Sequence, residues 1–195
     1  MILSAIMQPT FLPWIGYFDM MDQVDHFILY DDVQLAKRSW QIRNRIKTAQ
    51  GELFLTVPVK KTKNRDELLI SEAEISYEEN WQSKHLKSIE IAYGKAPYFS
   101  EVFHFICGLY SAKERFSWDF NSQFTISVSE KIGIECNILR ASLLFKISGA
   151  KDQRLASICK EIKSDTYLSP QGSAVYIESI IPGGELVKAG INLYY

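Results

Sequence analysis

The sequence has no excess of charge of either sign and few cysteines. Its 22 Lys and Arg residues against 23 Asp and Glu give a formal net charge of -1 at pH 7, so no global field favours nucleic acid or a membrane surface as a partner. The three cysteines are an odd number without a CxxC pair, which disfavours a disulfide framework and a zinc knuckle. Any anion recognition must therefore be local.

Long apolar runs and leader sequences are missing as well. No stretch approaches the roughly 18 apolar residues of a membrane span. The N-terminal MILSAIMQ lacks the basic residues and the cleavage pattern of a secretory signal, so we expect a cytoplasmic protein without a membrane span. Walker A, GxGxxG, GxSxG and HExxH motifs are also absent, and no motif predicts a cofactor.

What is present is an alternation of strand-like and helix-like stretches. A strand over 2–7, a helix over 15–23 and a strand over 26–30 predict parallel neighbours. A hairpin turned at Gln50 and Gly51, with a strand over 68–75, forms an antiparallel insertion. Helices are expected over 81–93, 101–112 (with Ser100 as N-cap), 119–132 and 152–162, and strands over 136–141, 167–169 and 190–195. We therefore expect one α/β domain, residues 1–195, with a mostly parallel sheet, helices on both faces and an antiparallel hairpin insertion.

The most informative stretch is MQPTFLPWIGYF, residues 7–18. Its two prolines restrict the backbone conformation of their own residues and of the residues before them. The stretch follows the first strand at the carboxyl edge of the sheet, where open α/β sheets bind ligands. We interpret it as a rigid pocket wall that offers Gln8, Pro9, Trp14 and Tyr17 to a substrate. The alternative is an apolar loop that only plugs the sheet edge.

Asp31 and Asp32 end the second predicted strand at the same edge. Such carboxylates can bind a divalent cation such as Mg²⁺, act as a catalytic base or simply solvate a strand end. Successive side chains of a strand point to opposite faces, so at most one of the two faces a given pocket. The alternative is a structural role for both.

Cationic side chains cluster around Trp40 and Asn44, namely Lys37, Arg38, Arg43, Arg45 and Lys47. Guanidinium groups bind carboxylates and phosphates in a bidentate manner, and an indole stacks on a ring. If 41–47 is a strand, then Arg43, Arg45 and Lys47 share one face. The pattern predicts local anion binding, with a solvated hairpin face as the alternative.

His85 lies on the apolar stripe of the predicted helix over 81–93, together with Trp81 and Ile89. Histidine has an ordinary pKa near neutrality and can serve as a general acid or base. A buried histidine with satisfied hydrogen bonds is the alternative.

Several blocks, in this order, resemble the WbqC-like family: QPTFLPWIGYFD, ILYDDVQLAKRSWQIRNRI, LTVPV, HLKSIEIAYGKAPYF and DTYLSPQGSAVY. The resemblance covers essentially the whole chain. It implies a role in bacterial O-antigen or other surface-polysaccharide synthesis, and a glycine or aminoacyl transferase role on an amino sugar has been suggested for the family. Gln8, Asp31, Arg43, His85 and Ser169 are among the residues that fit its pattern. Similar proteins usually continue past GINLYY, so a C-terminal segment usual in the family is expected to be missing.

The leading functional hypothesis is a transferase that moves an acyl or aminoacyl (glycine) group onto a nucleotide-linked amino sugar. Arg43, Arg45 and Lys47 would hold the diphosphate, Trp40 or Trp14 would stack on a ring, and His85 or Asp31 would deprotonate the amine. One alternative is a nucleotidylyltransferase-like, nucleotide-binding enzyme. The other is a non-catalytic binding or scaffold subunit of a polysaccharide pathway.

Overall fold

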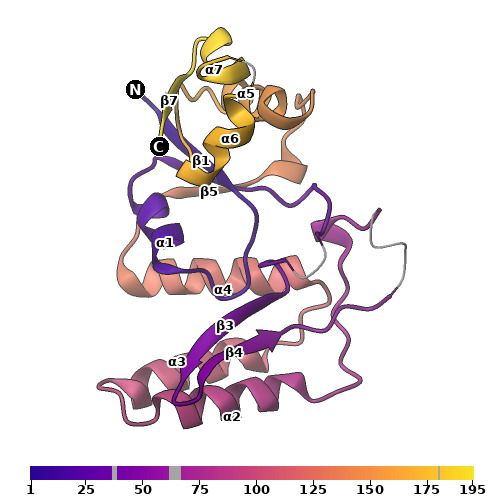
Figure 1. Ribbon diagram of the computed structural model, residues 1–195, viewed down its shortest axis with the longest axis vertical. Helices are drawn as coiled ribbons and strands as arrows, with labels where there is room; N and C mark the ends of the chain where they lie inside the picture. Colours follow the sequence, from indigo (N-terminus) through magenta and orange to yellow (C-terminus); the bar gives the residue numbers. More distant parts are fainter. Residues whose placement is uncertain (37–38, 62–66, 180) are drawn as a thin grey trace. The chain divides into compact units, whose positions relative to one another are not determined.

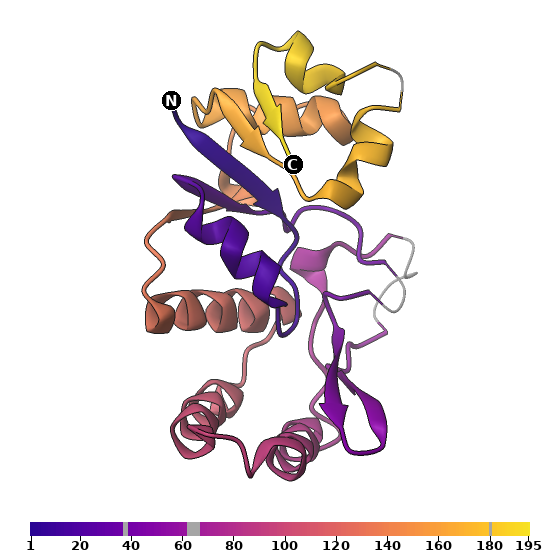
Figure 2. The same ribbon diagram turned by 60° about the vertical axis from the view of Figure 1, so that its left-hand side comes forward.

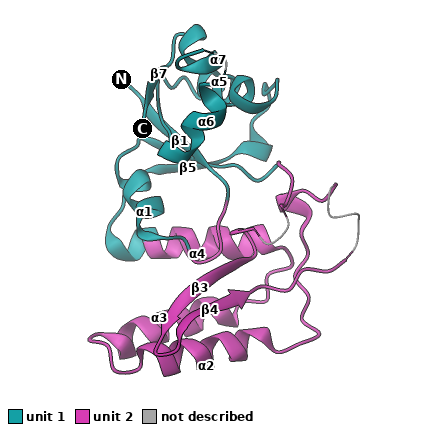
Figure 3. Ribbon diagram, viewed as in Figure 1, with its two compact units in different colours: residues 1–8, 13–32, 129–195 teal, residues 9–12, 33–128 magenta. Residues whose placement is uncertain are grey.

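A computed structural model describes residues 1–36, 39–61, 67–179 and 181–195. The chain divides into two compact units, coloured separately in Figure 3. Unit 1 comprises residues 1–8, 13–32 and 129–195, and unit 2 comprises residues 9–12 and 33–128. That residues 1–195 form one domain stays a prediction.

Unit 1 is built on a parallel sheet of five strands in the order β5-β2-β1-β6-β7. The strands are β1 (Leu3–Met7), β2 (His26–Leu29), β5 (Asn137–Arg140), β6 (Thr166–Leu168) and β7 (Asn192–Tyr194). The chain starts in the central strand, builds outward through β2 and β5, and then returns to the other side of β1. The α/β fold with a parallel sheet is thereby confirmed, and the reversal of strand order lies between β1 and β6.

Helices cover both faces of this sheet (Figures 1 and 2). The helices of unit 1 are α1 (Ile15–Asp22), α5 (Lys151–Glu161), α6 (Ala174–Ile177) and α7 (Gly184–Lys188), with short 3-10 turns η2 (Ala141–Leu143) and η3 (Gln171–Ser173). On one face Tyr17 of α1 contacts Phe27 of β2, with ring centroids 5.1 Å apart. On the other face Ile28 packs with side chains of α5, α6 and α7.

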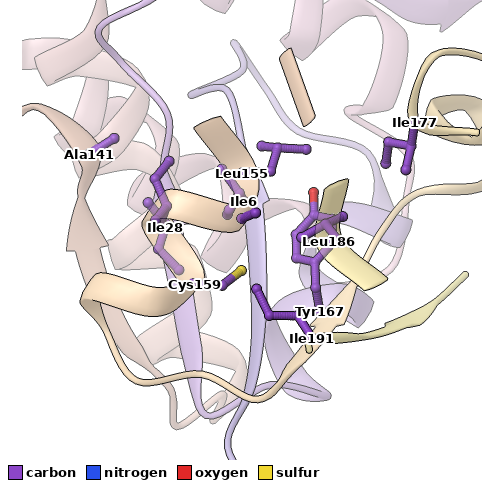
Figure 4. Close-up of a cluster of buried hydrophobic side chains, with 11 residues drawn as sticks. Ile6, Ile28, Ala141, Leu155, Cys159, Tyr167, Ile177, Leu186 and Ile191 are labelled. Atoms are coloured by element: carbon purple, nitrogen blue, oxygen red, sulfur yellow. The ribbon is translucent and has the colours of Figure 1, made fainter. Parts of the chain in front are cut away.

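Figure 4 shows this second face. Ile6, Ile28 and Tyr167 from the sheet lie with Leu155 and Cys159 of α5, and all five are buried. Alternate strand residues point to alternate faces, so neighbouring Phe27 and Ile28 serve opposite sides of the sheet. The apolar stripe of α5 is therefore the reason that this helix covers the sheet.

Unit 2 contains the antiparallel hairpin and the long helices. Its elements are β3 (Arg43–Thr48), β4 (Gly51–Thr56), η1 (Ile70–Glu72), α2 (Trp81–Tyr93), α3 (Phe99–Ser111) and most of α4 (Ser117–Ile132). Its core is aromatic: Phe11, Trp81, Tyr110 and Phe120 are buried together, with Tyr110 and Phe120 in an edge-on contact at 5.4 Å.

Three predicted details are wrong. The expected strand over 68–75 is instead the 3-10 turn η1 with isolated bridges to three different segments. Helix α3 begins at Phe99 rather than 101, so Ser100 lies within its first turn and Tyr98 precedes the helix with φ 61°. The hairpin register pairs Thr48 with Gly51, which moves the turn one residue back.

Two further observations concern bilayers and thiols. Within the described parts of the chain, no helix combines the length and the apolar character needed to cross a membrane. The three cysteines are free, and only Cys159 is buried, although free cysteine is among the most buried residue types. Burial raises the pKa of the Cys159 thiol to about 11, which keeps it protonated at neutral pH.

Candidate functional site

The carboxyl edge of the parallel sheet in unit 1 carries most of its chemistry. Gln8 follows β1, Asp31 and Asp32 follow β2, and Ser169 follows β6. In open α/β sheets, ligands bind outside the carboxyl ends of the strands where strand order reverses. That point lies between β1 and β6 here, so Gln8 and Ser169 flank it directly.

Asp31 is fully buried and clamps two strand ends together. Its carboxylate accepts a charged hydrogen bond from Arg140 Nε, at the end of β5. The backbone N–H of Ser142 donates to Oδ1 at 3.0 Å, and the Ser142 hydroxyl donates to Oδ2 at 2.8 Å. Both oxygens are therefore engaged, and this arrangement favours a structural role for Asp31.

Asp32 is the carboxylate that keeps an unused oxygen. Its Oδ2 accepts from Arg154 Nη2 of α5, and the two side chains are 21% and 23% exposed. Asp32 Oδ1 and Arg154 Nε are buried and make no hydrogen bond to a described residue. A guanidinium presents Nε and Nη2 along one edge. Here Nη2 is bonded to Asp32 Oδ2, whereas the acceptor Asp32 Oδ1 and the donor Arg154 Nε are left without a bond to a described residue.

Tyr30 lies beside this ion pair, and Tyr176 and Tyr167 lie near Tyr30. The Tyr30 ring lies 5.8 Å from the Arg154 guanidinium carbon. Burial is the main cause that raises the pKa of Tyr30 and of Tyr176, and Asp32 and Tyr176 raise that of Tyr30 further. Burial also raises the pKa of Tyr167, and its phenol hydrogen-bonds Ser169. All three phenols stay protonated at neutral pH and can donate hydrogen bonds.

Tyr30 and Arg154 are the members of this cluster that sequence reasoning missed. Tyr30 looked like the last residue of an apolar strand, and Arg154 lies on α5 beside the apolar stripe that includes Leu155 and Ile158. The only sequence signal was the position of Tyr30 directly before the two aspartates. Arg154 gave none, because it is 122 residues from Asp32.

The proline-rich loop divides between the units. In unit 1, Tyr17 is buried and its hydroxyl donates to the Gln8 carbonyl at 3.3 Å, an arrangement that fixes the start of α1. Trp14 is half exposed and lies edge-on to Tyr17 at 5.7 Å. A Cβ at Gly16 would lie 2.5 Å from Trp14 Nε1, so a larger residue there would displace the Trp14 ring. Because Trp14 is half exposed, its ring remains available for stacking.

In unit 2, the expected cationic face of the hairpin forms as its period of two requires. Arg43, Arg45 and Lys47 alternate with inward-facing Asn44 and Ile46. The Arg43 guanidinium lies 3.9 Å from the centroid of Phe54. Arg45 pairs with Glu52 across the hairpin at 2.9 Å and lies 5.9 Å from the half-exposed Trp40 ring. Lys37 and Arg38 lie outside the described residues. Part of the positive charge of this face is thus already offset.

His85 joins α2 to the edge of β4. The backbone N–H of Thr56 donates to His85 Nε2 at 3.1 Å, and Tyr110 Oη lies 3.5 Å from Nδ1. Burial lowers the pKa of His85 to about 4, so the ring is neutral near pH 7 and carries its proton on Nδ1. The lone pair on Nε2 is occupied by Thr56. A role for His85 as a base stays a prediction, and this geometry favours a structural role.

A cavity of about 880 Å³ lies beside this contact, between β4 and α2. Its walls include Trp81, Lys84 and His85 of α2. Lys84 already pairs with Glu79, another wall residue, at 2.6 Å, and the Trp81 indole N–H is buried without a described partner. The size suits a small ligand, but two of its lysines, Lys60 and Lys84, are already paired with Glu74 and Glu79.

Asn44 holds the proline-rich loop within unit 2. Its Nδ2 donates to the carbonyls of Phe11 and Leu12 at 3.1 and 2.8 Å, while its Oδ1 accepts from the Arg45 N–H. The side chain that the sequence assigned to substrate binding is therefore used to fix the backbone of the loop. Pro9, the other predicted binding residue of this segment, is buried in unit 2, where its carbonyl accepts from Asn121 at 3.3 Å.

Substitution Asn44→Ala is expected to lower the free energy of unfolding by about 2 kcal/mol, because two loop carbonyls lose their donor. Urea unfolding followed by tryptophan fluorescence measures this change. Asn44→Asp is the matched variant: it keeps the acceptor for Arg45 but has no donor, so it should cost at least as much. A loss below about 0.5 kcal/mol in both, the level of an ordinary surface substitution, would contradict the role of this clamp.

Asp31 and Asp32 are the residues that the sequence offers as ligands of a Mg²⁺ ion. Each carboxylate faces an arginine, and both oxygens of Asp31 already accept hydrogen bonds. Among the residues that the structure describes, no group of three or more His, Cys, Asp or Glu side chains is placed to share a metal ion. This donor set, as arranged, does not fit a divalent cation, which prefers several carboxylate or carbonyl oxygens.

Comparisons with known proteins add a family. The chain is 33% identical over 175 residues to the uncharacterized protein Rv1507c of Mycobacterium tuberculosis, a match that covers 89% of this chain and 74% of the relative. A search of solved structures finds no significant match. The sequence profile of the WbqC-like protein family matches residues 8–195, from the end of β1 to the last residue. Because that match covers nearly the whole chain, the protein belongs to the WbqC-like protein family.

Proposed function

We propose that this protein is a transferase of bacterial O-antigen or surface-polysaccharide synthesis that moves an acyl or aminoacyl group onto a nucleotide-linked amino sugar. The single observation that carries the proposal is the ion pair of Asp32 and Arg154 at the carboxyl edge of the parallel sheet. One carboxylate oxygen and one guanidinium nitrogen of that pair have no described partner.

An unused acceptor beside an unused donor fits a group that both donates and accepts, such as a sugar hydroxyl or an amine. Leaving either atom buried without a bond costs about 1 to 3 kcal/mol, and a ligand that supplies both bonds recovers that cost. The phenols of Tyr30 and Tyr176 add hydrogen-bond donors and flat apolar faces, which suit a sugar ring. Because Asp32 Oδ2 already accepts from Arg154, the remaining acceptor, Asp32 Oδ1, and the remaining donor, Arg154 Nε, are preorganised.

In the proposed step, the lone pair of the sugar amine attacks the acyl carbonyl of the donor, and the new C–N bond forms as the bond to the donor's leaving group breaks. The amine proton passes to Asp32 Oδ1, the free acceptor, and from there to the leaving group or to water. Asp32 takes this role in place of His85 or Asp31, whose acceptor atoms are occupied. Arg154 holds the Asp32 carboxylate in position.

A separate anion-binding face is proposed for the hairpin of unit 2, taken by itself. There Arg43, Arg45 and Lys47 would contact a phosphate group, and Trp40 would stack on a ring. The half-exposed Trp40 and the alternation of cations on one strand face support this assignment. Exposed ion pairs contribute little, so exchange of Glu52 for phosphate as the partner of Arg45 costs little.

Calorimetry with UDP-glucosamine tests the binding step. We expect Asp32→Asn and Arg154→Gln each to weaken binding by about 10- to 100-fold, because a hydrogen bond to a charged group contributes about 1.5 to 3 kcal/mol. Asp19→Asn, which removes a charge from exposed Asp19 on α1, should bind as the parent does. UDP-N-acetylglucosamine, in which the amine is blocked, should bind to the parent more weakly than UDP-glucosamine does, and Asp32→Asn should reduce this difference.

A transfer assay with activated acyl and glycyl donors tests the reaction. Product should appear with the parent and with Asp19→Asn, and should fall at least 100-fold with Asp32→Asn. Nucleoside triphosphate turnover with pyrophosphate release would instead support a nucleotidylyltransferase. Absence of nucleotide-sugar binding together with recovery of a stable protein partner would support a scaffold role, and either outcome refutes the proposal.

A further inference from the structure

A second, smaller cavity in unit 2 is almost wholly apolar. It has a volume of about 290 Å³ and lies between α2, α3, strand β3 and the proline-rich loop. Its walls are formed chiefly by Leu12, Ile46, Ile89, Phe99, Phe103 and Ile106. On α3, residues 99, 103 and 106 follow the spacing of one helix face, and that face both packs against the aromatic core of unit 2 and lines the cavity.

The walls are held in place by backbone that costs free energy to form. Leu12 has φ 47° and Tyr98, directly before α3, has φ 61°, a region that residues other than glycine rarely adopt. The Asn44 amide holds the carbonyls of Phe11 and Leu12, and Phe99 stacks on Phe103 at 4.8 Å. Strain of this kind persists where the surroundings fix it, often at ligand sites.

Among the described residues that line this cavity, only Tyr93 has a polar side-chain atom, its hydroxyl. Tyr93 Oη accepts the backbone N–H of Lys47 at 3.0 Å, whereas the phenol's own proton makes no bond to a described residue. The side chain is 37% exposed, so this donor is open to a ligand. Lys47 lies on the opposite face of β3 from Ile46, and none of the described residues that line the cavity is charged, so Tyr93 supplies its polar group.

We propose that this cavity binds an unbranched acyl chain, with the carbonyl end at Tyr93 and the chain among the side chains of α2 and α3. An apolar cavity of about 150 Å³ admits benzene, so 290 Å³ holds a chain of roughly ten carbons. The polar donor at one end and the apolar body match an acyl group rather than a uniformly apolar ligand. The acyl-binding site stands without the proposed function. Only the statement that the bound acyl chain is the group that the enzyme transfers rests on that function.

Direct binding of free fatty acids tests the cavity without any transfer reaction. Titrations of the full chain with butanoate, hexanoate, octanoate, decanoate and tetradecanoate, followed by calorimetry, should show affinity that rises about fourfold per added methylene. The rise should stop near ten carbons, where the cavity is full. Equal binding of all five acids, or a rise that continues to tetradecanoate, would overturn the proposal.

Variants locate the site. Ala96→Trp fills the mouth from an exposed wall position and should weaken octanoate binding at least tenfold. Ile91→Trp adds the same ring at a site on α2 that is 75% exposed and outside the cavity, and should leave binding unchanged. Tyr93→Phe should weaken octanoate binding several-fold while preserving the dependence on chain length. Unfolding curves for each variant show that it is folded.

The two proposals can fail separately. Chain-length-dependent binding with no transfer to any amino sugar would refute the transferase and leave the acyl site standing. Transfer of glycyl groups by Ala96→Trp at the parent rate, with octanoate binding lost, would refute the use of this cavity for the transferred group. If octanoate binding survives Ala96→Trp unchanged, the acyl site is not in this cavity.

Discussion

Substitution of Asp31 by alanine is expected to lower the free energy of unfolding by about 3 to 5 kcal/mol. Asp31 is fully buried, and it accepts hydrogen bonds from Arg140 and from two groups of Ser142. Removal of the carboxylate takes the buried negative charge away from Arg140 and leaves the Ser142 N–H without an acceptor. Urea unfolding at pH 7 measures the loss, which is a large part of the stability of an ordinary domain.

A double variant tests the physical cause. Asp31→Leu combined with Arg140→Met removes both charges, and it should be clearly more stable than Asp31→Ala because no charge remains unpaired. Asp19→Ala, at an exposed position, should change the unfolding free energy by no more than about 0.5 kcal/mol. A loss below about 1 kcal/mol for Asp31→Ala would show that water replaces the carboxylate without cost.

Acid is expected to destabilise the protein through His85 between about pH 6.5 and pH 4. Burial lowers the pKa of His85 to about 4 in the folded chain, against about 6.5 when unfolded. In that pH range the unfolded chain binds the proton more tightly, so stability falls as pH falls. The slope approaches 1.4 kcal/mol per pH unit and the total is on the order of 3 kcal/mol.

Urea unfolding at pH 7, 6, 5 and 4.5 measures this slope against His85→Gln. Glutamine offers a carbonyl to the Thr56 N–H but does not titrate, so the variant should be nearly flat between pH 6.5 and 5. Carboxylates with lowered pKa values, such as Glu74 and Glu79, affect stability only nearer pH 4. Parallel curves for parent and variant above pH 5 would mean that His85 is not the titrating group.

The experiments on Asp31 and Asp32 distinguish a structural residue from a substrate-binding residue at neighbouring positions. Asp31 and Asp32 are adjacent in sequence, yet Asp31→Ala should act on stability and Asp32→Asn on binding. The difference follows from what each oxygen contacts, because every oxygen of Asp31 is bonded, whereas Asp32 Oδ1 is not.

Elements with their own periodic signal could be predicted. The helix over 81–93 was expected with the bounds that α2 has, because its apolar spacing is regular and Gly94 ends it. The stretch 68–75 misled because its buried residues form two pairs with the spacing of a strand, Leu68/Ile70 and Ala73/Ile75, although the phase shifts by one residue between the pairs. It bridges three separate segments instead of one strand, so no continuous ladder forms. An alternating pattern of apolar and polar residues indicates which side chains are buried. Whether the stretch becomes a strand depends on whether a neighbouring strand pairs with it.

The sequence by itself determined the α/β class, the parallel start of the sheet, the hairpin and the family, because periodicity and the QPTFLPWIGYFD block are local properties of the chain. It also determined that Arg43, Arg45 and Lys47 share one strand face. Only the tertiary structure decided that both oxygens of Asp31 are hydrogen-bonded and that Asp32 keeps a free oxygen. Their partners, Arg140 and Arg154, lie more than 100 residues away in the sequence. The tertiary structure likewise decided that Leu12 of the proline-rich loop lines an apolar cavity, because that wall needs Asn44, α2 and α3 to meet it.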